Sequence, residues 1–194
     1  MVVTTELLDA LLSPSQGGGQ HSPRAQAEHH LSSLSLSDRV AGLLNLLLST
    51  ANNASATNNA NNAAADQSRA MLCAVLLRRD IATLGGNAHS ATGLDHGTAL
   101  QMMREMVPPL LQLFLAGGIN NGNGNGNGGS SKTTRRQVGH CLAELCLSCS
   151  VLGGAAAADA AGANNVAGEV MAQVLTGIGP GVSCMSIIYV WAAV

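Results

Sequence analysis

The chain has 194 residues, of which 46% are hydrophobic and only 10% are charged, and its formal net charge is −2. That length is sufficient for one domain or for a short array of structural repeats. A net charge so close to zero provides no basic field for nucleic acid or for an anionic membrane, so neither is expected as a partner.

Signals for α-helices recur along the chain, whereas signals for β-strands do not. Ser22 followed by Pro23 combines a good N-cap with proline at the first helical position. The remaining helices are expected to begin at Asp66 and near Val166, and after the capping residues Thr5, Ser37, Thr98 and Ser131. The sequence therefore predicts an all-α fold.

Three low-complexity tracts separate the expected helices. They are rich in Asn, Gly and Ala and cover residues 52–65, 117–129 and 153–165. Such tracts bury too little apolar area to offset the entropy of ordering the backbone. We therefore expect all three to be flexible, disordered loops.

Two of the expected helices carry an apolar stripe at helical spacing. In the helix from residue 98 the stripe continues in phase across Pro108 and Pro109, which predicts one kinked helix. Its members are Leu100, Met103, Val107, Leu110, Leu111 and Phe114. In the helix from residue 132 the stripe is Val138, Cys141, Leu142, Leu145, Cys146, Cys149 and Leu152. On that helix His140, Glu144 and Ser148 are expected on the opposite side.

The segment "DQSRAMLCAVLLRRDI", residues 66–81, differs because it has no polar face between Ala70 and Leu77. A helix that is apolar all round is normally enclosed by neighbours. Arg78 and Arg79 then follow where the helix is expected to emerge. The pair is either a solvated helix end matched to the helix dipole or a basic patch for an acidic partner.

Taken in pairs, the expected helices form units of roughly forty residues, a period typical of HEAT and armadillo repeats. The pairs are 5–12 with 22–34, 37–51 with 66–82, and 98–116 with 132–152, followed by an unpaired 166–176. This period predicts an α-solenoid of HEAT-type helical hairpins.

The run from Arg69 to Arg79 resembles the B helix of the second repeat in importin-β-type nuclear transport receptors, most closely in the importin-5 (karyopherin-β3) branch. Other segments agree with that family in order. They are "ELLDALLSP" and "PRAQAEHHL" for the first hairpin, "LLNLLLST" for the next A helix, and "TTRRQVGHCLAELCLS" for the third B helix.

The resemblance implies a receptor in the cytoplasm and nucleus that carries proteins through the nuclear pore. It implies that cargo and the small GTPase Ran, in its GTP form, bind the concave face formed by B helices, and that phenylalanine-glycine nucleoporins bind between A helices. Arg78, Arg79, Arg135 and Arg136 would lie on B helices, which makes them the candidate protein-binding residues.

The resemblance supports a repeat array over residues 1–176, with about three hairpins and one further helix. It stops at the apolar tail 177–194, which we interpret as a product of truncation or mis-splicing. A HEAT-repeat scaffold that assembles other proteins without Ran is the alternative function, and a non-functional truncated product is a third hypothesis.

Catalytic and cofactor sites are not expected. Cys141, Cys146 and Cys149, near His140, lack the ligand spacing of a zinc site, so we expect buried core thiols. The glycines of 124–129 spell a dinucleotide fingerprint, but no strand precedes them. No paired carboxylates or Ser/His/Asp set shares a face, so neither an enzyme nor a cofactor is predicted.

Overall fold

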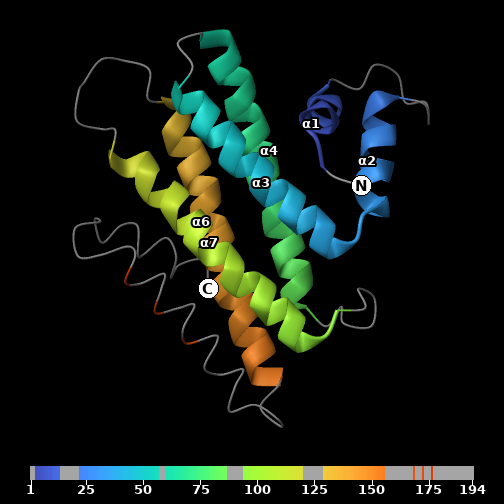
Figure 1. Cartoon of the computed structure of the whole chain (residues 1–194), viewed down its shortest axis with the longest axis vertical. Helices are drawn as coiled ribbons and strands as arrows, with labels where there is room; N and C mark the ends of the chain where they lie inside the picture. Colours follow the sequence, from blue (N-terminus) through green and yellow to red (C-terminus); the bar gives the residue numbers. More distant parts are fainter. Residues whose placement is uncertain are drawn as a thin grey trace. The chain divides into compact units, whose positions relative to one another are not determined.

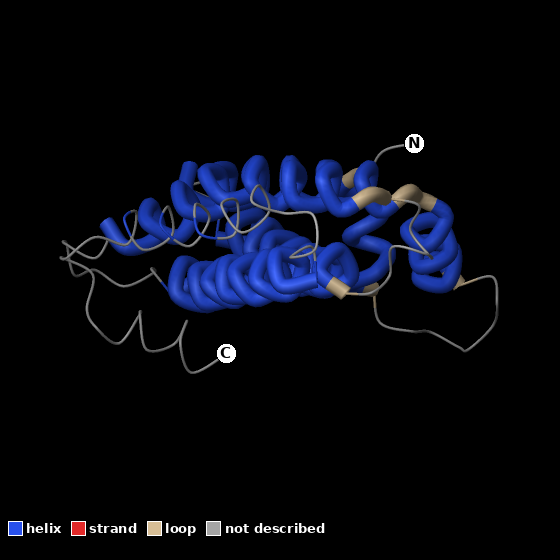
Figure 2. Tube along the Cα trace, turned by 90° about the horizontal axis from the view of Figure 1, so that it is seen from below, coloured by secondary structure: helices blue, strands red, loops and turns tan. Residues whose placement is uncertain are grey.

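A computed structural model describes residues 3–13, 22–56, 60–86, 94–119 and 129–155, together with Gly168, Ala172 and Thr176. Its helices are α1 (Thr5–Leu12), α2 (Pro23–Ser33), α3 (Leu36–Ala56), α4 (Ala60–Gly85), α6 (His96–Ile119) and α7 (Gly129–Ala155). Within these residues there is no β-strand, as Figure 2 shows. The all-α prediction is confirmed.

The chain divides into two compact units. Unit 1 covers residues 1–77 and contains α1, α2, α3 and the first part of α4. Unit 2 covers residues 78–194 and contains the end of α4 together with α6 and α7. The boundary falls inside α4, after Leu77, and each unit is described by itself below.

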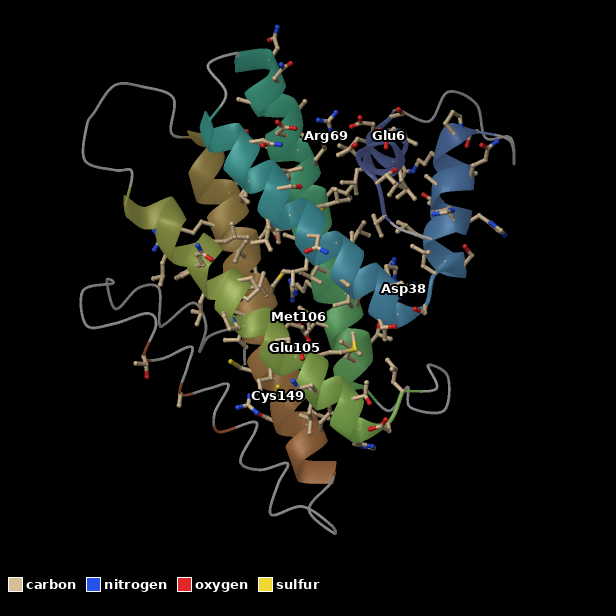
Figure 3. All side chains as sticks on the ribbon, in the orientation of Figure 1. Glu6, Asp38, Arg69, Glu105, Met106 and Cys149 are labelled. Carbon is tan, nitrogen blue, oxygen red and sulfur yellow. The ribbon has the colours of Figure 1, made fainter. Side chains whose placement is uncertain are left out.

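In unit 1, α1 packs against α2 as the sequence predicts. Leu8, Leu31, Leu43 and Leu47 are buried and form much of the apolar core of this unit. On the polar side, Arg69 of α4 binds the carboxylate of Asp9 on α1. Its Nε and Nη2 atoms lie 2.7 Å from Oδ1 and Oδ2 respectively. Figure 3 shows Arg69 beside α1, the helix that carries Glu6.

In unit 2, α6 and α7 lie side by side and pack together (Figure 1). Every member of the two predicted apolar stripes is buried, so both stripes are confirmed. One prediction for α7 is wrong. Ser148 was expected on the polar side but is only 3% exposed, because α4 packs closely against it. Its buried hydroxyl donates to the carbonyl of Ile81 on α4.

Helix α6 continues through Pro108 and Pro109, as the in-phase stripe predicts. Each proline removes the amide hydrogen that would bond to the carbonyl four residues earlier. Those carbonyls belong to Arg104 and Glu105, and both residues are exposed, as is Pro108. Water can therefore satisfy the carbonyls, and the two prolines are tolerated on the solvent side of the helix.

The positions of several N-caps differ from the prediction, always by an upstream shift. Ser22 caps α2 as expected, accepting a bond from the amide of Ala25 at 3.2 Å. The α3 cap is Ser35 rather than Ser37, and it bonds to the amide of Asp38 at 3.1 Å. In the same way α1 is preceded by Thr4 rather than Thr5.

The cap of α6 shows one physical reason for such a shift. The cap is Asp95 rather than the expected Thr98. The carboxylate of Asp95 accepts hydrogen bonds from the amide of Thr98 at 2.9 Å and from its hydroxyl at 2.7 Å. These bonds from Thr98 lower the pKa of Asp95. The true cap and its partner three residues later are both polar, so sequence alone points to either residue. Helix α7 begins at Gly129, upstream of the expected start at Ser131.

The prediction that whole low-complexity tracts are loops is wrong where they join helices. Residues 52–56 belong to α3, and 60–65 form the first turns of α4. Likewise, 117–119 lie in α6, and Gly129 and 153–155 lie in α7. Alanine has the highest helix propensity, so the Ala-containing stretches at the end of α3 and the start of α4 extend a helix that is already packed. The glycines at the ends of α6 and α7 have no such propensity, and nothing in the structure explains their helical conformation. Residues 57–59, 120–128 and 156–165 lie outside the described residues.

Two predictions near the C-terminus concern residues that are almost entirely outside the described part of the chain. Within the helix expected at 166–176, the structure describes Gly168, Ala172 and Thr176, and each of the three is helical. The apolar tail 177–194 lies outside the described residues.

The α4 segment quoted above is not enclosed on every side. Met71 is 38% exposed and Val75 is 47% exposed, so the prediction of an enclosed helix is wrong for one face. The helix also does not end at Arg78 and Arg79, because α4 continues to Gly85. No basic residue occupies its last turn, so the arginine pair is not matched to the helix dipole.

Candidate protein-binding site

The four candidate arginines all belong to unit 2, two on α4 and two on α7. Arg78 contacts Glu144 on α7, one turn beyond His140, and Arg136 lies one turn before His140 on the same helix. The guanidinium groups of Arg78 and Arg136 both act to lower the pKa of His140. Arg79 and Arg135 do not join this group. We call Arg78, Arg136 and His140 the basic cluster.

Arg78 reaches from α4 to α7 through an ion pair. Its Nε atom lies 3.4 Å from Oε2 of Glu144, and the two side chains are 48% and 17% exposed. The pair is partly screened by water, so it adds little to stability. Its main effect on the site is to hold the guanidinium of Arg78 near α7.

His140 is half-buried on the same helix as Arg136. Its pKa is lowered, first because burial disfavours the charged ring and then because Arg78 and Arg136 repel a third positive charge. The ring is therefore predominantly neutral near pH 7, with one nitrogen able to donate and the other able to accept a hydrogen bond.

A pocket of about 500 Å³ lies along this part of α7. The residues that line it are Thr133, Arg136, Gln137 and His140. Each of these side chains can donate a hydrogen bond, and no carboxylate is among the lining residues that the structure describes. The arrangement is suited to binding oxygen acceptors with negative charge.

Arg135 has a structural role within unit 2. Its guanidinium carbon lies 4.7 Å from the centre of the Phe114 ring on α6, a cation–π distance. The edge of the same ring packs against Gly139, where an added Cβ would lie only 3.2 Å from Cε2 of Phe114. Arg135 is thus held in the contact between α6 and α7.

Arg79 is 65% exposed, the most exposed of the arginines in ion pairs on α4. Its Nε atom lies 3.9 Å from Oδ1 of Asp80, a carboxylate that is only 1% exposed. At that distance the contact is a long ion pair without a short hydrogen bond. The guanidinium of Arg79 can be reached by a partner, but it lies outside the pocket lining that the structure describes.

The cysteines that the structure describes are buried and have free thiols, as predicted for core residues: Cys73, Cys141, Cys146 and Cys149. Burial raises the pKa of Cys73, Cys141 and Cys149 to about 12. Among the residues that the structure describes, no group of three His, Cys, Asp or Glu side chains is placed to hold a metal ion.

The sequence analysis did not single out Thr133, Gln137 and His140 as residues of a shared pocket. A signal was present, because residues 133, 137 and 140 follow one another at helical spacing on a polar face. Arg78 was already a candidate from the sequence, but its contact with Glu144 could not be inferred from helical spacing, since the two residues lie on different helices.

No family model matches the chain, and no curated protein or solved structure matches it at a significant level. Among the described residues, no helix combines the length and apolar character needed to cross a membrane. The function is therefore argued from the residues themselves and from the resemblance of the helical segments.

Proposed function

We propose that this chain is part of an importin-β-type nuclear transport receptor, an α-solenoid of HEAT-type hairpins that carries proteins between cytoplasm and nucleus. Its partners would be Ran in the GTP form, cargo proteins and phenylalanine-glycine nucleoporins. The order of the helical segments that resemble this family is the observation that carries the proposal.

Several features of the structure are compatible with this function. Consecutive antiparallel helices joined by a connection are the unit of such solenoids, and α1 with α2 and α6 with α7 are two packed consecutive pairs. The basic cluster adds a surface that can receive acidic side chains of a partner. Arg135 is removed from the proposed contact residues, because its guanidinium stacks on Phe114.

A test of this proposal is the binding of the full chain to Ran loaded with GTP or with GDP, measured by isothermal titration calorimetry. We expect heat of binding with the GTP form and none with the GDP form. Circular dichroism of the same sample shows whether it is helical and folded. Equal or negligible binding of both forms by a folded sample would contradict the proposal.

A HEAT-type scaffold that binds other proteins without Ran is the second candidate function. It is favoured by large apolar side chains that remain exposed on α4 and α7: Met71, Val75, Leu147 and Val151. Exposed apolar groups of this kind are used at protein interfaces. Recovery of a stable complex that contains neither Ran nor nucleoporins would favour the scaffold.

A further inference from the structure

We propose that the pocket on α7 binds an extended, acidic peptide segment of a partner protein, with Arg136 and His140 receiving two carboxylates that alternate along the peptide. The proposal uses residues of unit 2 alone. It does not depend on nuclear transport, since any partner with the right acidic segment would satisfy it.

The chemistry of the lining indicates an anionic ligand. Arg136 is exposed and charged, and Thr133, Gln137 and His140 add three further side chains that can donate hydrogen bonds. Charge-assisted bonds from a guanidinium to a carboxylate are about twice as strong as neutral ones. Arg78 adds a second guanidinium from α4, which contacts Glu144 one turn beyond His140.

The spacing of the donors indicates a peptide in extended conformation. Arg136 and His140 are one helical turn apart, a rise of about 6 Å along the axis. Alternate side chains of an extended chain lie on one face with a repeat of about 6.6 Å. Two acidic residues separated by one other residue therefore match the two donors in register.

The pocket is an open depression on α7, with described lining residues from this one helix, and is unlike an enclosed phosphate site. Its donors are also distributed over two helical turns rather than converging on one point. Nucleic acid is disfavoured, because a chain with a net charge of −2 lacks the basic field that binds a phosphate backbone.

Glu144 limits the site at one end. It lies one turn beyond His140 and accepts the hydrogen bond of Arg78, so it neutralises part of the charge of the basic cluster. A peptide carboxylate placed beyond His140 would meet this negative charge. Replacement of Glu144 should therefore free Arg78 and strengthen binding of an acidic peptide, an effect opposite to that of losing Arg136.

The test uses the full chain and a fluorescent Gly/Ser peptide that carries two glutamates separated by one glycine. A peptide with glutamine at both positions is the matched control ligand. We expect fluorescence anisotropy to show binding of the acidic peptide only. Arg136→Gln should weaken it about five-fold, as expected for one exposed charge pair. Arg136→Lys should retain most of the affinity.

Two further variants decide whether the effect belongs to this site. Arg24→Gln removes an arginine of comparable exposure on α2 and should leave the affinity unchanged. Glu144→Gln should increase the affinity about two-fold or more, which a folding defect would not do.

Equal binding of both peptides, or an Arg136→Gln affinity equal to that of the unmodified chain, would overturn the proposal. A competition experiment tests whether the site instead binds free phosphate. An excess of inorganic phosphate is added to the bound acidic peptide, and its effect is compared with that of chloride at equal ionic strength. Displacement of the peptide by chloride and phosphate alike supports a peptide site. Tight binding of phosphate without binding of the acidic peptide would overturn the proposal in favour of a phosphate site.

Discussion

The hydroxyl of Ser148 on α7 donates a hydrogen bond of 3.3 Å to the backbone carbonyl of Ile81 on α4. One turn along α4, Gly85 faces the same serine, and a Cβ added at Gly85 would collide with the Cα, Cβ and Oγ atoms of Ser148. Small side chains on both helices thus let their backbones approach closely inside unit 2. This approach buries Ser148, although it lies outside the apolar stripe of α7.

Gly85→Ala should destabilise the protein by about 1–3 kcal/mol, the usual cost of overpacking, although alanine favours helix more than glycine does. The measurement is the urea midpoint followed by circular dichroism. Gly86→Ala is the control, because its added Cβ would make only ordinary contacts, the nearest at 3.4 Å from the Ala82 carbonyl. If Gly85→Ala and Gly86→Ala are equally stable, the close approach of Gly85 to Ser148 does not exist in solution. Adding Ser148→Gly to Gly85→Ala should recover part of the loss.

The ion pair between Arg69 and Asp9 should couple α4 to α1 measurably. It has two short contacts of 2.7 Å, and Arg69 also bonds to Asp66 at 2.8 Å. A double-mutant cycle with Arg69→Met and Asp9→Asn should give a coupling free energy of about 1 kcal/mol, the upper end for a partly exposed pair.

The matched comparison is the pair Arg24 and Glu28, which has one contact of 2.9 Å between more exposed side chains. An i,i+4 pair of this kind should give a coupling of about 0.3–0.5 kcal/mol. A larger coupling for Arg24 and Glu28 than for Arg69 and Asp9 would show that the bidentate geometry does not form in solution.

Adjacent arginines on α7 should behave differently on substitution. Arg135→Gln removes the contact with Phe114 and should cost about 0.5–1 kcal/mol of unfolding free energy. Arg136→Gln changes an exposed side chain in the pocket and should cost less than about 0.5 kcal/mol. Urea unfolding of both variants checks this, and equal losses would contradict the separation of their roles.

Phe114→Leu is a second probe of the same contact. It keeps most of the buried apolar volume and removes the ring on which Arg135 stacks. In this background Arg135→Gln should have almost no further effect, because its interaction partner is already gone. Full additivity of the two substitutions would show that Arg135 is stabilised by something other than the ring.

His140 should titrate below the ordinary histidine pKa, measured from the ring proton signals by NMR. Arg136→Gln should raise the pKa of His140, because it removes one repelling charge, and Arg24→Gln should not change it. Since the folded state holds this proton less tightly than the unfolded state, the contribution of His140 to stability falls as pH drops below about 6.5. If Arg136→Gln left the pKa of His140 unchanged, this would contradict the placement of Arg136 and His140 in one basic cluster.

The four buried thiols should resist alkylation in the native protein. Burial holds the pKa of Cys73, Cys141 and Cys149 at about 12, so the reactive thiolate is scarce near pH 8. Mass spectrometry after a short iodoacetamide pulse should find these cysteines and Cys146 unmodified, and fully modified after unfolding in urea. Rapid native labelling of Cys141 would contradict its burial.

Much of the helical architecture could be predicted from local sequence. The stripe through Met103 and Phe114 and the stripe through Cys141 and Cys149 are both buried as their spacing requires. The helix through Pro108 also followed from a stripe that stays in phase. These predictions succeed because periodicity, capping and propensity are properties of neighbouring residues.

The sequence could not place the groups whose environment depends on another helix. Ser148 is buried because Ile81 offers a carbonyl and Gly85 leaves room for it, and neither is near it in sequence. Arg135 and Arg136 are neighbours of the same type, yet Phe114 separates their roles.

By itself, the sequence determined the all-α class and the buried faces of α6 and α7. Apolar residues at helical spacing lie on one face of the helix, and that face must pack against the core. Only the tertiary structure decided which polar groups meet, as with Arg78 of α4, which contacts Glu144 on α7 one turn beyond His140. The physical reason is that charge and hydrogen-bond energies depend on distances of a few ångströms between separate helices, which the order of residues does not specify.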